Sequence, residues 1–190
     1  MAQSRVIEHE ASDQELLTRY RNGDRDAFAE IVVRYQRPVY NAALWMLRNV
    51  DDARDVAQAV FLKVVERLDD YDPRYKFFSW IYRIAVNESL NYKRRQGHEE
   101  PLDDDAELPD GDALSPESQM QLAERSRHVH QALQSLSTND RTVLMLRHFS
   151  ECSYEEIAEI LDLDEKTVKS RLFEARHRLG GKLKDWGPQQ

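Results

Sequence analysis

Basic side chains near the C-terminal end of the chain have a spacing that suits binding to duplex DNA. At about 100° per residue of an α-helix, the segment 166–179 carries two rows of cations, Lys169 with Arg176 and Arg171 with Arg178. The face between the rows consists of Lys166, Ser170, Phe173 and Glu174. Cations at both edges of a polar face suit a helix in the major groove, which contacts phosphates along its sides and base edges along its middle.

Two short helices joined by a tight turn are predicted to position these side chains. Ser153 and Glu156 have the spacing of a capping box at the start of the first helix. Asp164 can cap a second helix that starts near Lys166, with Leu163 buried in the turn. Apolar stripes complete the two helices: Ile157, Ala158, Ile160 and Leu161, then Val168, Leu172, Ala175 and Leu179. Together these features predict a helix-turn-helix, whereas the second helix alone would fit a solvated basic surface equally well.

The net charge of the chain, −8 at pH 7, argues against a nucleic-acid binder only if the charges are evenly spread. They are not. The segment 97–117 holds nine acidic residues and neither Lys nor Arg, and without it the net charge would be +1. The segment 166–184 holds seven basic residues and one acidic residue. Because local fields guide binding, the overall acidity does not exclude nucleic acid as a partner.

The acidic segment is predicted to be a flexible linker, since it contains three prolines and few large apolar residues. It would be either a solubilising spacer or an anionic strand that lies in a positively charged channel of a partner. The linker, residues 97–120, divides the chain into an N-terminal domain, 1–96, and a C-terminal domain, 121–190. The expected fold is all-α: two small helical domains joined by a flexible acidic linker, with the helix-turn-helix in the second.

Four helices are expected in the N-terminal domain. The first spans Asp13 to Arg21, and Asp24 can cap a longer one in which Pro38 predicts a kink. Asp51 can cap a third helix. Its apolar residues keep a helical period over four turns: Ala53, Val56, Ala57, Val60, Phe61, Val64, Val65 and Leu68. The other face of this helix carries Asp55, Gln58 and Lys63, and the pattern alone indicates no more than a core helix.

The fourth helix, from about Phe77 to Arg95, mixes aromatic and cationic residues. Its polar stripe, Arg83, Asn87 and Asn91, repeats every four residues. The best core candidates are Trp80, Ile81, Ile84 and Ala85. Rings beside cations also suit single-stranded nucleic acid, because bases stack on rings and the backbone follows the charges, but core packing is the stronger interpretation of composition alone.

No residue pattern indicates an enzyme, a cofactor or a metal site. The chain has no phosphate-cradling glycine loop, and its single cysteine, Cys152, has no evident catalytic partner. His128 and His130 are two residues apart on an expected helix and would face apart; with Cys152 and His148 they are a weak candidate for metal ligands. The N-terminus lacks the apolar core of a secretory signal, and no window has the roughly 20 apolar residues of a membrane span. We therefore expect a cytoplasmic protein without membrane insertion.

Taken together, the two halves resemble a sigma factor of the extracytoplasmic-function group of the sigma-70 family. The resemblance runs from about Asp13 to Leu183. It depends on DARDVAQAVFLKV and FFSWIYRIAVNESLNYKRR in the first half, the acidic linker, and YEEIAEIL followed by TVKSRLFEAR in the second. The implied function is to direct core RNA polymerase to specific promoters and to initiate transcription.

The resemblance also implies roles for individual residues. Contacts with core RNA polymerase would come from Asp55, Gln58 and Phe61. Contacts with the melted minus-10 strand would come from Tyr71, Arg83, Asn87 and Asn91, with Tyr71 and Asn87 lining the pocket for a flipped base. Contacts with minus-35 duplex DNA would come from Lys166, Thr167, Lys169, Ser170, Arg171, Phe173 and Arg176. The linker would thread near the RNA path, and an anti-sigma factor, often membrane-anchored in this family, would control the protein.

Two positions depart from the family pattern. Ala59 stands where Glu commonly follows the glutamine of the polymerase-binding helix, and Glu174 stands where Arg is common in the recognition helix. Glu174 would repel phosphate or accept a hydrogen bond from cytosine N4, which would change the promoter sequence. Two other functions remain open: a free-standing helix-turn-helix regulator that acts without polymerase, and an interaction protein for which DNA is incidental.

Overall fold

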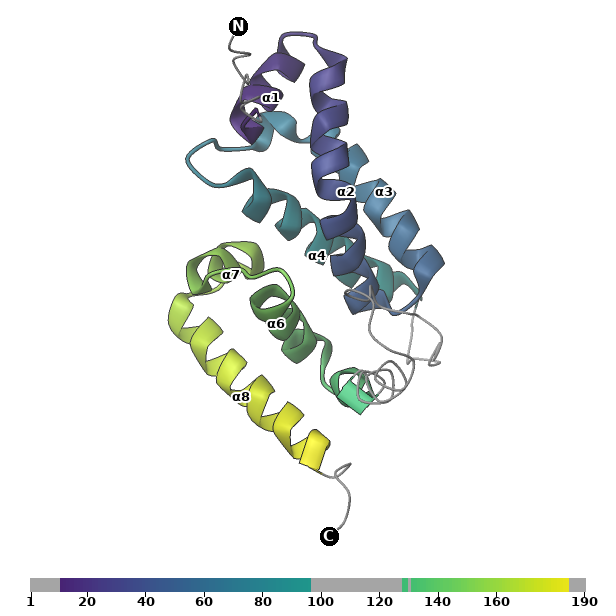
Figure 1. The fold of residues 1–190 in the computed structure, drawn as a ribbon, viewed down its shortest axis with the longest axis vertical. Coiled ribbons are helices and arrows are strands. Elements are labelled where there is room, and N and C mark those ends of the chain that lie inside the picture. The colour runs from purple at the N-terminus through teal and green to yellow at the C-terminus, as the bar shows by residue number, and fades with distance from the viewer. Residues whose placement is uncertain (1–10, 97–127, 130, 185–190) are drawn as a thin grey trace, which may run out of the picture.

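The computed structural model describes residues 11–96, 128–129 and 131–184, and within these ranges all regular secondary structure is helical. Figure 1 shows two helical units that lie one above the other. The N-terminal unit consists of α1 (Asp13–Arg21), α2 (Arg25–Leu47), α3 (Val50–Glu66), the 3-10 turn η1 (Leu68–Asp70) and α4 (Phe77–Gln96). The C-terminal unit consists of α6 (Thr138–His148), α7 (Tyr154–Leu161) and α8 (Glu165–Lys184). The predicted all-α fold and the bounds of α1 and α4 are confirmed.

Side-chain caps set the starts of the helices. Asp24 accepts hydrogen bonds from the first amides of α2, as predicted. The prediction for α3 is wrong, because the cap is Asn49 and not Asp51. The side-chain oxygen of Asn49 accepts from the backbone N–H groups of Asp51 and Asp52, at 2.9 and 3.0 Å. The carboxylates of Asp51 and Asp52 therefore lie in the first turn, where they interact favourably with the positive end of the helix dipole.

The core of the N-terminal unit lies between α2, α3 and α4, which pack against one another. α2 is continuous through Pro38, where the sequence predicts a kink. In α4, Ile81 and Ala85 are fully buried as predicted, but Phe77 and Tyr82 are also buried, while Trp80 and Ile84 are only partly so. Val65 departs from the predicted stripe of α3, because its side chain is 42% exposed.

The C-terminal unit is a helix-turn-helix supported by α6. The predicted capping box at the start of α7 is present, with Ser153 and Glu156 each bonding the other's backbone N–H. In the turn, Asp162 adopts a left-handed conformation (φ 55°) and Leu163 is only partly buried. The predicted stripe of α8 faces α6 and α7: Val168, Leu172 and Ala175 are buried and Leu179 is partly buried.

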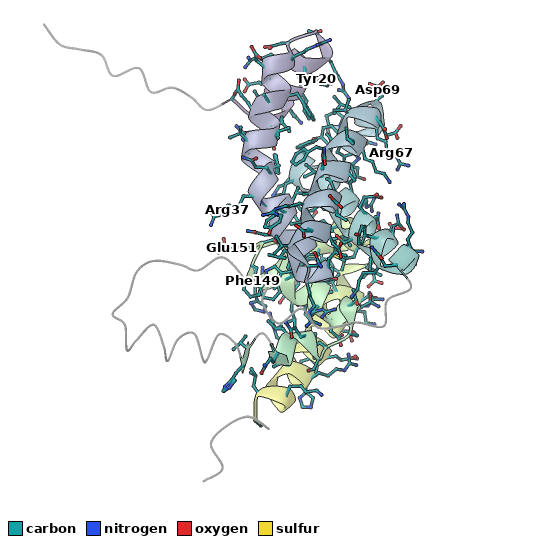
Figure 2. The ribbon with its side chains drawn as sticks, turned by 90° about the vertical axis from the view of Figure 1, so that its right-hand side faces the viewer. Tyr20, Arg37, Arg67, Asp69, Phe149 and Glu151 are labelled. Carbon is teal, nitrogen blue, oxygen red and sulfur yellow. The ribbon has the colours of Figure 1, made fainter. Side chains whose placement is uncertain are left out.

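The two units are in contact. α4 packs against α7, and α2 packs against α6. The rings of Trp45 and Phe149 are 4.3 Å apart between centroids. Figure 2 shows Phe149 and Glu151 at this boundary, close to the end of the N-terminal unit. The predicted linker, residues 97–120, lies outside the described residues, so the proposed domain limits of 1–96 and 121–190 stay predictions.

Candidate nucleic-acid interface

The outer face of α8 is exposed along its length. Phe173 is 73% exposed, the largest exposed fraction among the large apolar side chains that the structure describes. The other exposed members of the predicted duplex-binding set are Lys166, Lys169, Ser170 and Arg176, while Thr167 and Arg171 are partly exposed. The Phe173 ring lies in water among cations and has little apolar surface to pack against. This face therefore has the features of a surface that a ligand covers.

The start of α8 is held by Asp164, as predicted. Its carboxylate accepts from the backbone N–H of Thr167 at 2.8 Å and from the Thr167 hydroxyl at 2.7 Å. These hydrogen bonds hold the pKa of Asp164 below its ordinary value. Thr167 is thus already bonded within the helix, and Lys169 is paired with Glu165 at 2.8 Å. Both residues would have to exchange these partners to contact DNA.

The two flanks of α8 differ in their contacts. On one flank Arg178 donates to both oxygens of Asp140, at 2.9 and 2.7 Å, and to Glu174 at 2.9 Å. Arg178 therefore joins α8 to α6 and also draws Glu174 into an ion pair. On the other flank Arg176 donates to Nε2 of His148 at 3.3 Å. Burial, and then the charges of Arg176 and Arg147, lowers the pKa of His148.

A second candidate surface is an open cleft of about 670 Å³ beside α4. Tyr71 lies in its wall, 5% exposed, with its ring 5.5 Å from Phe77 and 5.4 Å from Trp80 between centroids. The Tyr71 hydroxyl donates to the carbonyl of Tyr75 at 2.8 Å. Rings grouped in this way form a platform on which a base could stack.

Not all of the predicted strand-binding residues meet at this cleft. Tyr71 and Arg83 line it, whereas Asn87 and Asn91 do not. Asn87 is exposed one turn further along α4, and Asn91 is bonded to Glu88 and Arg94. The predicted set did not include five other residues of the N-terminal unit that line the cleft: Asp70, Asp72, Tyr75, Ser79 and Trp80. The interleaving of rings and cations around Phe77 was the available signal.

The outer face of α3 forms a third candidate surface. Asp55 and Gln58 are exposed and Phe61 is partly exposed. Leu62 and Val65, which the prediction did not include, are 61% and 42% exposed. These five residues recur at intervals of three and four and so share one face of the helix. An apolar patch rimmed by polar residues is typical of a protein-binding surface.

Comparison with known proteins identifies the family of both helical units. Residues 31–99 match the family described as "Sigma-70 region 2", and residues 126–179 match "Sigma-70, region 4". The ECF RNA polymerase sigma-E factor of Escherichia coli (strain K12) is 36% identical over 186 residues, which is 93% of this chain and 97% of that protein. The chain belongs to the extracytoplasmic-function (ECF) sigma factors. Within this sigma factor, the α3 patch lies in region 2, α7 and α8 lie in region 4, and the cleft is lined by residues of both regions.

Two further relatives agree with this assignment. The RNA polymerase sigma-H factor of Pseudomonas aeruginosa is 37% identical over 176 residues, 88% of this chain and 91% of that protein. The structure of CnrH in complex with the cytosolic domain of CnrY superposes with a TM-score of 0.69 at 26% identity, covering 92% of this chain and 99% of CnrH. The similarity therefore extends over both regions of the sigma factor.

Three further features of the sigma factor concern its single thiol, candidate metal ligands and candidate membrane spans. Burial raises the pKa of the Cys152 thiol to about 12, and the side chain is 1% exposed. In the described part of the chain, no group of three or more His, Cys, Asp or Glu side chains could hold a metal ion. His130 lies outside that part. Of the helices that the structure describes, none has the length and apolar character to cross a membrane.

Proposed function

We propose that this sigma factor brings core RNA polymerase to promoters through two DNA contacts, one with duplex and one with melted DNA. The observation that carries the proposal is the arrangement of α8, whose buried stripe is fixed against α6 and α7 while Phe173 and its neighbouring cations face outward. That arrangement commits one helix face to an external ligand. We further propose that the protein performs no covalent chemistry and that it acts in the cytoplasm, where polymerase and promoters are.

Region 4 would bind the minus-35 element with α8 in the major groove. Lys169 and Arg176 would contact phosphates at its edge, and Lys166, Ser170 and Phe173 would face the bases. Thr167 and Arg171, partly exposed, would contribute at the start and the side of the helix. The Glu174 carboxylate would sit close to the DNA, with its charge partly balanced by Arg178 at 2.9 Å.

Region 2 would hold the melted minus-10 strand at the aromatic cleft. Tyr71 and Trp80 offer ring faces for stacking, and Arg83 offers a cation for the strand backbone. Asn87 could accept and donate hydrogen bonds at the Watson–Crick edge of a flipped base. Asn87 lies outside the cleft, one turn of α4 beyond Arg83. A base that contacts both Asn87 and Tyr71 would therefore have to extend from the cleft along that turn.

The α3 face would dock on core polymerase. Asp55 and Gln58 supply polar contacts there, and Phe61, Leu62 and Val65 supply apolar area. Ala59 lies beside this face and adds no polar group. We also infer control by an anti-sigma factor, for which the complex of CnrH with the cytosolic domain of CnrY offers support.

Co-elution with core polymerase tests the docking surface. Asp55→Lys combined with Leu62→Lys should abolish co-elution, because both changes put charge on the docking face. Asp26→Lys combined with Glu30→Lys alters exposed positions of α2 and should leave co-elution intact.

The DNA contacts are tested separately. Lys169→Ala with Arg171→Ala should preserve co-elution and abolish promoter-specific transcription. An interaction protein for which DNA is incidental would keep its activity in that variant. A free-standing regulator would bind a duplex operator as a two-fold dimer and would not co-elute with polymerase.

A further inference from the structure

The face of α4 that carries Arg83 is in contact with region 4. Arg83 donates to the backbone carbonyl of Glu159 at 2.9 Å and to the carboxylate of Asp162 at 3.3 Å. Lys76, just before α4, donates to Glu156 at 2.7 Å. All three acceptors belong to α7 or its C-cap. The cation proposed to hold the melted strand is thus already bonded to the helix-turn-helix.

The same contact changes the charge of the aromatic cleft. Region 2 contributes Arg83 and the carboxylates of Asp70 and Asp72 to its lining. Region 4 adds four more carboxylates, those of Glu155, Glu159, Asp162 and Glu165. Among the described residues that line the cleft, six are acidic and Arg83 is the one cation. A phosphate backbone entering this space would meet strong repulsion.

Apolar packing supports the contact at a second point. Phe149, at the C-cap of α6, is 55% exposed, and its ring stacks at 4.3 Å on Trp45 of α2. The contact is therefore supported by this ring pair and by two cations, Arg83 in α4 and Lys76 just before it. The duplex-reading face of α8 is not involved, since Phe173 remains 73% exposed.

We propose that α7 is an internal competitor of the melted promoter strand: its acidic side occupies the strand-binding face of region 2 and must leave before that strand can bind. The consequence for transcription rests on the proposed function, whereas the contact itself does not. Opening releases Arg83, and it removes four carboxylates from the cleft that Tyr71 and Trp80 line. Duplex binding by α8 does not require it.

The test uses the full chain with three changes in region 4, Phe149→Ala, Glu156→Gln and Asp162→Asn. Gln at 156 keeps an acceptor for the capping box, and Asn at 162 tolerates the left-handed conformation. The matched control, Asp26→Asn with Glu66→Gln, removes the same two charges from exposed positions of region 2. The readouts are the radius of gyration from X-ray scattering and the affinity for a labelled single-stranded DNA of mixed sequence. A mixed-sequence duplex serves as the second probe.

The triple variant should show a larger radius of gyration and about fivefold tighter single-strand binding than wild type. Duplex binding should be unchanged, and the control should match wild type in all three measurements. The proposal is overturned if the radius stays at the wild-type value, if it rises without a gain in single-strand affinity, or if the control gains equally. Should the triple variant lose its helical signal, Lys76→Glu replaces it, read by the radius of gyration alone, with a rise expected and no change contradicting the proposal.

This result is separable from the proposed function. Transcription from promoters is measured with wild-type protein, so failure there would reject the sigma-factor role while the opening of the contact is still judged by scattering and strand binding. Conversely, normal transcription with an unchanged radius in the triple variant would reject only the internal competitor.

Discussion

Leu172 and Phe173 are neighbours in α8, yet the Leu172 side chain faces the core and the Phe173 side chain faces outward, 1% and 73% exposed. Leu172→Ala should lower the free energy of unfolding of region 4 by about 3 kcal/mol, because it leaves a cavity in the core. Phe173→Ala should change it by less than about 0.5 kcal/mol. Denaturant titration gives both values. Equal destabilisation by the two changes would show that Phe173 is part of the core.

The same pair separates folding from binding. Phe173→Ala should reduce promoter-specific transcription although the protein remains fully folded. If transcription by this variant matched wild type, Phe173 would have no role in reading the promoter.

Glu156 closes the capping box of α7, with its carboxylate accepting from the backbone N–H of Ser153 at 2.7 Å. Glu156→Ala should cost about 1 kcal/mol of unfolding free energy, and Glu156→Gln clearly less, since the amide oxygen can still accept. Burial alone would raise the pKa of Glu156, but the hydrogen bonds from Lys76 and Ser153 outweigh it and the pKa is lowered.

The sign of the resulting pH dependence follows from that lowered pKa. The carboxylate stabilises the folded state fully above its ordinary value of 4.5, and the contribution is lost as pH falls through the lower folded-state pKa. Glu156→Gln should therefore flatten the acid side of the stability profile below about pH 4.5. A steeper acid side in the variant would contradict the assignment.

Glu174 tests whether α8 approaches DNA phosphates. Because its carboxylate lies on the exposed face, Glu174→Gln should raise the affinity for duplex DNA by about threefold. This gain in affinity should become smaller when salt is added, because salt screens the repulsion between a carboxylate and the DNA phosphates. Glu66→Gln, an exposed change away from α8, is the control for net charge. An equal gain in both variants would show that overall charge, and not the position of Glu174, causes the effect.

Cys152 should be almost inert in the folded protein. A pKa of about 12, against an ordinary 9.0, reduces the thiolate fraction at neutral pH about a thousandfold, and burial blocks access as well. Native protein should react with a thiol reagent at least that much more slowly than the same protein in denaturant. Comparable rates would mean that the segment around Cys152 opens readily.

Local patterns predicted much of this molecule. The Ser153 capping box, the Asp164 cap and the stripe of Val168, Leu172 and Ala175 all depend on neighbours within a few residues, and each is confirmed. The start of α3 was misplaced because Asn49 and Asp51 are both good caps, two residues apart. Composition cannot rank them when the backbone geometry is unknown.

What the sequence could not show is contact between distant segments. Arg83 bonds to Asp162, 79 positions away, and no periodicity records that pairing. The exposure of Leu62 and Val65 could not be predicted either, since an apolar residue in a helix fits a core and a docking surface equally well. The cleft lining of Tyr75, Ser79 and Trp80 likewise depends on how α4 meets the loop before it.

Run-off transcription with purified core polymerase and a promoter library tests the central claim most directly. The protein should produce transcripts from a subset of promoters that share two elements, and Lys169→Ala with Arg171→Ala should remove them while core polymerase still binds. Transcription no different from that of core polymerase alone, across the whole library, would contradict the account.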